Sequence, residues 1–250
     1  MKRRLYTKSY DINELTKLDS EKLFTAKESE ELIEIELGRS VFRSKESVLE
    51  YYLPKCFSKF EALEFLKNRI EEEKYQNIIS FGSGSSVLEY LLYLSLSKDK
   101  NIVSSEFNNF YVEKSNEFFP EFLTIQFDFT KDTLSKVDTN FDIAVFFCSS
   151  YVMDDDEFIN FFKHLKSEGV KEIIDFDSAF MTKTTQFKNA IRPIIEVAKK
   201  FKSTTSDNFE GKFHGYSRSR KELLNLYKES GWLVKKELTL GVYKFCAVLN

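Results

Sequence analysis

Two glycines separated by one residue follow a strand-like run, and this arrangement can bring a ligand against the main chain. The run covers residues 77–81 and leads into Gly82, Ser83 and Gly84. Glycine lets the backbone approach a ligand closely, and a helix that begins there offers free N–H groups. A plain tight turn has the same composition, so this motif alone leaves both interpretations open.

Acidic residues follow the next two strand-like runs. Glu106 comes after residues 101–105, and Asp128 with Phe129 comes after the third run. A carboxylate at a strand end can accept hydrogen bonds from ribose hydroxyls, and Asp128 beside an aromatic ring can accept one from an adenine amino group. Asp128 can equally cap the turn near Thr130. The glycine turn followed by Glu106 favours a nucleoside-type ligand.

The elements that must position these residues alternate between two types from residue 77 onward. We expect strands at residues 77–81, 101–105, 122–127, 141–147 and 170–176, with helices at 87–96, 109–119 and 156–167. This alternation predicts an α/β fold with a parallel, doubly wound sheet and helices on both faces. Ligands bind beyond the carboxyl ends of such strands, which is where the glycine turn and both acids would lie.

A helix and a hairpin are expected to close the sheet. Ser219 can cap a helix that ends at Gly231, and strand-like runs at 232–238 and 242–249 meet at Gly241. So short a connection requires an antiparallel pair. We therefore expect a Rossmann-like, seven-stranded sheet with an antiparallel last strand.

Two segments fall outside this alternation. Residues 1–74 are charged and helical in pattern, with an expected interruption at Pro54, and predict a helical N-terminal extension before a domain at 75–250. Residues 178–215 are rich in Thr, Ser, Lys and Asn, and we expect a substrate-side insertion or lid there. A surface insertion without function is the alternative.

Composition argues against several classes of function. The chain has 37 basic and 40 acidic residues, without the basic excess that nucleic-acid binding leaves. The longest near-apolar run, residues 141–148, is too short to cross a bilayer, and no signal-peptide pattern begins the sequence, so we expect a cytoplasmic protein without membrane contact. Cys56, Cys148 and Cys246 lie far apart, and the acids at 154–156 suit a helix start, so no disulfide framework or metal site is expected.

Over about residues 77–249, the chain resembles the class I S-adenosylmethionine-dependent methyltransferase family. The resemblance rests on the glycine turn, Glu106, the pair Asp128 and Phe129, the strand at 141–145 and the closing helix and hairpin. The hairpin is the most discriminating feature, because nicotinamide-binding Rossmann domains lack it.

The resemblance implies S-adenosylmethionine as the cofactor and a place for each residue. Glu106 would bind the ribose and Asp128 the adenine, while Cys148 and Ser149 would lie near the transferred methyl group. The rest of the implied cofactor-binding set comprises Phe81, Gly82, Ser83, Gly84 and Phe129.

The chain departs from the family pattern at two positions. Ser80 stands where the family usually has an acid, two residues before the first glycine, and Ser86 stands where it usually has a third glycine. Backbone carbonyls around Phe81 and Gly82 can then bind the methionine amino group. The same departures keep open a catalytically inactive, methyltransferase-like binding module.

Methyl transfer from a sulfonium is an in-line displacement, so the protein mainly positions the acceptor. An alcohol acceptor also needs a base near the proton that it loses. His214 is the first candidate, with Tyr151, Asp175 and Asp177 as further candidates at the same edge of the sheet. A lone histidine can equally be structural or merely exposed.

Two arginines at the start of the last helix suggest how an acceptor could be held. Arg218 and Arg220, with Tyr216 beside them, can bind a phosphate or carboxylate on the acceptor. Exposed arginines without a partner are the alternative. The sequence therefore predicts O-methylation of a small, anionic or glycan-precursor acceptor, with a protein or RNA acceptor as the competing interpretation and homodimerisation left open.

Overall fold

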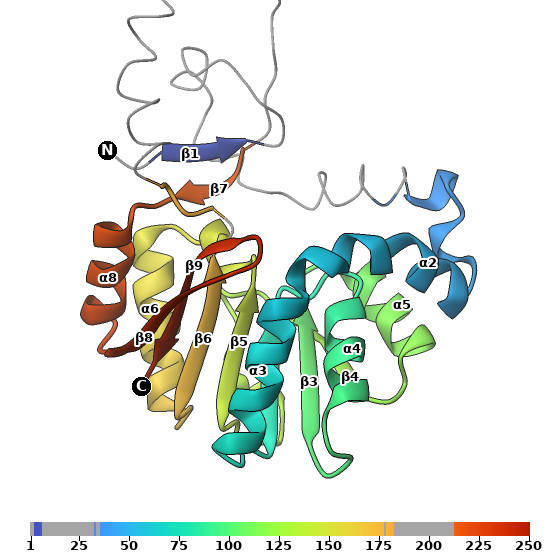
Figure 1. Cartoon of the computed structure of the whole chain (residues 1–250), viewed down its shortest axis with the longest axis horizontal. Helices are drawn as coiled ribbons and strands as arrows, with labels where there is room; N and C mark the ends of the chain where they lie inside the picture. The colour runs from blue at the N-terminus through green and yellow to red at the C-terminus, as the bar shows by residue number, and fades with distance from the viewer. Residues whose placement is uncertain (1–2, 7–32, 34–35, 178, 183–212) are drawn as a thin grey trace, which may run out of the picture.

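A seven-stranded sheet forms the centre of the computed structural model, which describes residues 3–6, 33, 36–177, 179–182 and 213–250. In spatial order its strands are β4 (Leu123–Gln126), β3 (Asn101–Glu106), β2 (Asn77–Phe81), β5 (Ile143–Phe147), β6 (Glu172–Asp177), β9 (Tyr243–Leu249) and β8 (Val234–Leu240). Neighbouring strands from β4 to β6 run parallel, whereas β9 is antiparallel to both β6 and β8. The expected doubly wound sheet with an antiparallel last strand is confirmed (Figure 1).

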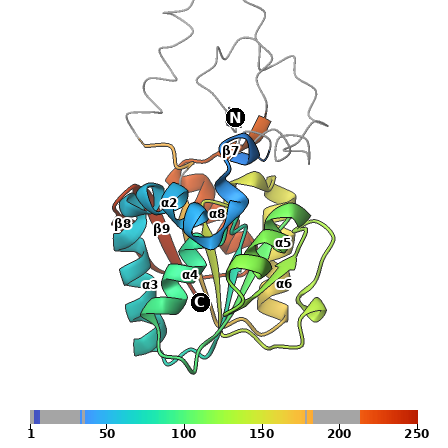
Figure 2. The same cartoon turned by 90° about the vertical axis from the view of Figure 1, so that its right-hand side faces the viewer.

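Helices cover both faces of this sheet. On one face α3 (Phe60–Glu72) and α4 (Val87–Ser95) pack over the core, and on the other α6 (Asp155–Ser167) and α8 (Arg220–Glu229) do so (Figure 2). Because β5 is covered on both sides, every one of its residues is buried.

Short-range hydrogen bonds define where these helices begin and end. Ser219 accepts from the N–H of Glu222, whose carboxylate accepts from the N–H of Ser219, so the expected cap at Ser219 is confirmed and is part of a capping box. Asp154 and Glu157 form the same arrangement at the start of α6. Gly231 follows α8 with a φ of 83°, a left-handed conformation that ends the helix.

The N-terminal region differs from the expectation in two ways. β1 (Arg3–Tyr6) is a strand, paired antiparallel with β7 (Phe213–Ser217) in a separate two-stranded sheet (Figure 1). So short a strand is stabilised by a partner far away in the sequence, which no local pattern reveals. The expected interruption at Pro54 was also wrong, since α2 (Lys45–Cys56) continues through it; a proline removes one N–H donor, and little of the helix remains beyond it.

Two expectations fall on segments outside the described residues. Most of the expected insertion, namely residue 178 and residues 183–212, lies there, and so do the helical patterns between residues 7 and 32. The proposed lid therefore stays a prediction.

The sheet order creates a crevice beside β2. The chain moves from β2 to β3 and β4 on one side, then returns to β5 on the other. Loops after β2 and β5 therefore lead away in opposite directions, and this is the place where open α/β sheets bind ligands.

Candidate active site

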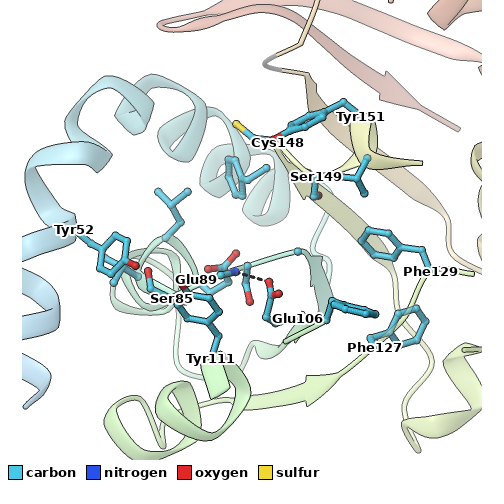
Figure 3. Close-up of a pocket in the computed structure, with 18 of the residues that line it drawn as sticks. Tyr52, Ser85, Glu89, Glu106, Tyr111, Phe127, Phe129, Cys148, Ser149 and Tyr151 are labelled. Atoms are coloured by element: carbon cyan, nitrogen blue, oxygen red, sulfur yellow. Dashed lines mark hydrogen bonds between the residues drawn. The ribbon is translucent and has the colours of Figure 1, made fainter. Parts of the chain in front are cut away.

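A cavity of about 630 Å³ opens at the carboxyl ends of the parallel strands (Figure 3). This volume is typical of a small-molecule site. Most residues expected to contact a cofactor line it: Gly82, Ser83, Gly84, Glu106, Asp128, Phe129, Cys148 and Ser149. Phe81 is fully buried beneath the cavity and stacks on Phe146, with their ring centroids 5.1 Å apart.

The glycine turn is held against the ends of β3 and β5. The N–H groups of Gly82 and Ser83 both donate to the carbonyl of Ser105, at 2.9 and 3.0 Å. Gly82 has a φ of 70°, and a Cβ at this position would lie 2.5 Å from Cβ of Ser149. Only glycine fits there, for both conformational and steric reasons.

Ser86 occupies the place of the family's third glycine and keeps a left-handed φ of 56°. A buried network of serine hydroxyls surrounds it: its Oγ lies 3.1 Å from that of Ser104 and accepts from Ser115 at 2.9 Å. Ser83 joins the network by accepting from Ser104 at 2.6 Å. These bonds stabilise a backbone conformation that a side chain otherwise disfavours.

Glu106 points across the glycine turn. Its Oε2 accepts from the N–H of Gly84 at 2.8 Å (Figure 3), and its Oε1 accepts from the N–H of Asn108 at 3.1 Å. Each carboxylate oxygen keeps a lone pair for a further donor. Burial raises the pKa of this carboxyl, and the backbone N–H bonds oppose that rise.

Asp128 fits both interpretations of its role. Its Oδ1 accepts from the N–H and Oγ1 of Thr130, at 2.9 and 2.7 Å, so it caps the turn, and it also lines the cavity. Burial alone would raise the pKa of Asp128, but hydrogen bonds from Thr130 and Lys131 outweigh it, and the pKa lies below its ordinary value. Phe129 beside it packs on Phe161, with ring centroids 5.1 Å apart.

The loop after β5 forms the opposite wall. Cys148 has a left-handed φ of 58°, and its thiol lies 3.5 Å from the hydroxyl of Tyr243. Tyr151, on η4 (Ser150–Val152), lines the cavity and lies directly under Gly215 of β7. Burial raises the pKa of Tyr151 to about 12, so its phenol is protonated at neutral pH and is a hydrogen-bond donor rather than a ready base.

Asp175 does not reach the cavity, contrary to the expectation that it is a catalytic base. It is fully buried, and its two oxygens accept from Ser150 Oγ and Tyr227 Oη, both at 2.7 Å. Asp177 is also buried and accepts from the N–H of Ala179 at 2.7 Å. Both carboxyls belong to the packing behind the loop after β5.

Neither Arg218 nor Arg220 is among the described residues that line the cavity. Arg218 is 1% exposed, and its Nη2 donates to Asp155 Oδ1 at 3.0 Å and to the carbonyl of Met153 at 2.7 Å. Arg220 is exposed and forms a two-pronged ion pair with Glu237, at 2.6 and 2.7 Å. Burial argues against acceptor binding by Arg218, whereas for exposed Arg220 this role stays a prediction.

The two remaining candidates, Tyr216 and His214, both lie in β7. Tyr216 packs with its ring centroid 5.4 Å from Cζ of Arg218, and it is not among the described residues that line the cavity. His214 lies in β7, but its side chain is outside the part of the chain that the structure describes. Its role as a base stays a prediction.

Several cavity residues escaped the sequence analysis. Tyr52 and Tyr111 donate to the two oxygens of buried Glu36, and this cluster lines the cavity. Lys55 and Lys59, at the end of α2 and in the turn after it, line the same side. The sequence pattern predicts only a helical extension here, and no residue type or spacing in it indicates that the helix closes a cavity.

Glu89 was also missed, although a signal for it exists. It is the only charged residue in the apolar stretch at 87–96. The structure places it on the cavity wall, with Ser80 Oγ donating to its Oε1 at 2.6 Å.

No protein-family model matches this chain, and no curated protein sequence matches it. Solved structures do resemble it. An amino pentose methyltransferase from Micromonospora echinaspora has a TM-score of 0.54 at 7% identity, covering 75% of this chain and 89% of its own. An S-adenosylmethionine-dependent methyltransferase from Clostridium acetobutylicum has a TM-score of 0.53 at 11% identity, with the same coverages of 75% and 89%.

A magnesium protoporphyrin IX methyltransferase from Synechocystis is similar as well, with a TM-score of 0.52 at 9% identity over 77% of this chain and 81% of its own. At such identities the likeness concerns the fold. The chain has the fold of the class I S-adenosylmethionine-dependent methyltransferases.

Within the described residues, no helix is long and apolar enough to span a membrane.

Proposed function

We propose that this chain is an S-adenosylmethionine-dependent methyltransferase that acts on a small-molecule acceptor. The observation that carries the proposal is Glu106, whose carboxylate is bound to the N–H of Gly84 at the edge of the cavity. This arrangement sets a hydrogen-bond acceptor for a ribose diol beside a turn without side chains at Gly82 and Gly84. The methyltransferase fold supports the same ligand.

The residues present fit an adenosyl group. Glu106 keeps free lone pairs, and Phe127 and Phe129 line the cavity where the base would lie. Cys148 and Ser149 lie on the wall where an acceptor would approach. Bound there, the cofactor supplies a methyl group already activated by its sulfonium, so the chain has to bind, orient and exclude water.

The helix α2 closes one side of the cavity, which favours a small acceptor. Two of the similar structures are described as methyltransferases of a porphyrin and of an amino pentose, which supports small molecules as a class. With Arg218 and Arg220 engaged elsewhere, Lys55 and Lys59 are the cationic groups left to attract an anionic acceptor in the described part of the cavity wall. O-methylation remains our preferred chemistry, with His214 as the proposed base.

The cofactor assignment is tested by isothermal titration calorimetry with S-adenosylhomocysteine. We expect saturable binding of one molecule for each chain. Absence of heat and of any thermal stabilisation would overturn the proposal and favour a binding module without this cofactor.

The acceptor assignment is tested by release of S-adenosylhomocysteine with a panel of alcohols that differ only in bearing a phosphate, a carboxylate or no charge. We expect turnover with anionic members, and a rise in KM of about tenfold when both lysines are changed to Gln, which corresponds to about 1.4 kcal/mol for the loss of two charge contacts. Lys163→Gln on α6, exposed and away from the cavity, is the matched control. Turnover confined to neutral acceptors would contradict the anionic preference.

A further inference from the structure

Glu89 is a buried carboxylate with one oxygen that lacks a partner. It lies in the first turn of α4, is 1% exposed, and its Oε1 accepts from Ser80 Oγ at 2.6 Å. Its Oε2 is buried and has no hydrogen-bond partner among the residues that the structure describes. Glu89 also belongs to the cavity wall, and Figure 3 shows it among the side chains that converge there.

A buried carboxylate of this kind raises the free energy of the folded state unless a donor binds it. A buried carboxylate oxygen without a donor loses its hydration and gains nothing in return. Burial accordingly raises the pKa of Glu89 to about 7. The other residues of α4 (Val87–Ser95) are uncharged, so Glu89 has no ion-pair partner on its own helix.

The unpartnered oxygen calls for a cationic donor of a particular kind. In the described residues no group of His, Cys, Asp and Glu is arranged to hold a metal ion. Glu106, the other carboxylate at this turn, already accepts from two backbone N–H groups. A single carboxylate with one free oxygen suits an alkylammonium group.

The position of Glu89 indicates which ligand group carries this ammonium. Its carboxylate is hydrogen-bonded to Ser80, two residues before Gly82, at the position where the family pattern has its acid. The carbonyl of Phe81, one of those expected to bind the amino group, accepts instead from Ser149 Oγ at 2.6 Å. An acid supplied by the helix therefore stands where the strand lacks one.

We propose that Glu89 binds the α-ammonium group of the methionine part of the cofactor. The inference rests on the proposed function, because it requires S-adenosylmethionine in this cavity. It assigns the ends of the ligand to two different acids: Glu106 takes the ribose, and Glu89 takes the amino acid.

The test compares S-adenosylhomocysteine with 5′-methylthioadenosine, which keeps the adenosyl group and lacks the amino acid. Calorimetry on Glu89→Gln should show affinity for S-adenosylhomocysteine falling about 10- to 100-fold, as for loss of a charged hydrogen bond. Affinity for 5′-methylthioadenosine should stay within about threefold. Glu113→Gln, an exposed change on α5 (Asn109–Phe118), is the matched control and should alter neither.

Either of two results would overturn the inference: unchanged affinity for both ligands, or an equal loss for both. Failure of the unsubstituted protein to bind either ligand would instead overturn the proposed function, so the two failures are distinguishable.

A second measurement needs no substitution. The polar and charged groups that face Glu89 in the described part of the chain are Ser80 from β2, Lys59 from the turn after α2, Glu106 from β3, Cys56 from α2 and Tyr243 from β9. Binding an ammonium should ionise Glu89, so near pH 6 S-adenosylhomocysteine should release more protons than 5′-methylthioadenosine does. Calorimetry in two buffers of different ionisation enthalpy measures this, and equal proton release would contradict the assignment.

Discussion

Ser149 lies where a side chain on Gly82 would have to be. A Cβ at Gly82 would come within 2.5 Å of the Cβ of Ser149, whose hydroxyl meanwhile donates to the carbonyl of Phe81. The turn after β2 and the loop after β5 are therefore packed against each other at the floor of the cavity. The shape of the cavity depends on this contact.

Gly82→Ala tests the contact directly. The substitution adds both a left-handed conformational cost and a steric clash. Gly169→Ala is the matched control, because Gly169 has a φ of 84° and nothing within 4 Å of an added Cβ. We expect Gly169→Ala to lower the free energy of unfolding by about 1–2 kcal/mol, and Gly82→Ala to lower it by a further 1–3 kcal/mol or so. Urea denaturation measures both values. Equal losses in the free energy of unfolding would show that Ser149 moves aside without cost.

Glu106→Gln should weaken adenosine-type ligands as a class. Because this carboxylate is proposed to bind the ribose, affinities for S-adenosylhomocysteine and 5′-methylthioadenosine should fall together, by about 10- to 100-fold. Calorimetry with both ligands separates this behaviour from that of Glu89→Gln. Loss of the first ligand alone would place the ribose elsewhere.

Arg218 should contribute much more than Arg220 to the free energy of unfolding. Arg218→Ala removes a buried cation that binds both Asp155 and the carbonyl of Met153, and it should lower the free energy of unfolding by about 3–5 kcal/mol. Arg220→Ala breaks an exposed pair with Glu237 and should leave stability unchanged within error. Chemical denaturation checks both. A specific rise in acceptor KM for Arg220→Ala, with stability intact, would restore it as an acceptor-binding residue.

Glu89 should make the protein less stable as pH rises. Its pKa lies near 7 when folded and near 4.5 when unfolded, so the folded state holds more protons between those values. The free energy of unfolding then falls across pH 4.5–7 and levels off above it. Buried Asp175 and Asp177, whose pKa values are raised to about 6 and about 7, contribute with the same sign. At pH 8, Glu89→Gln should raise the free energy of unfolding, by at most about 3 kcal/mol.

Thermal unfolding from pH 5 to pH 8 checks this prediction. The difference between Glu89→Gln and the unsubstituted protein should grow with pH, whereas Glu113→Gln should track the unsubstituted protein throughout. A parallel pair of curves would mean that Glu89 is ionised at pH 5 already.

Sequence reasoning was most successful where the relevant forces are local. The alternation of apolar runs, the cap at Ser219 and the short turn at Gly241 each reflect contacts within a few residues, and they predicted the seven-stranded sheet. Position at strand ends likewise brought Glu106 and the glycine turn together, because parallel strands end at one edge.

The misplaced residues share a different cause. The partners of Arg218 and Asp175 are Asp155, Ser150 and Tyr227, all remote in sequence, so their burial could not be read from neighbours. The pairing of β1 with β7 is of the same kind. A polar residue whose partner comes from a distant element looks free to bind a ligand in the sequence, but in the folded protein it is already hydrogen-bonded.

The place of β9 in the sheet has a consequence for biosynthesis. This strand is the last element of the fold, yet it lies between β6 and β8 and is buried along most of its length. Until residue 249 has left the ribosome, the edge of β6 that pairs with β9 has no neighbour, and it is open to pairing with another nascent chain. The domain must therefore complete its folding after synthesis of this region, and chaperone demand should be concentrated in that interval.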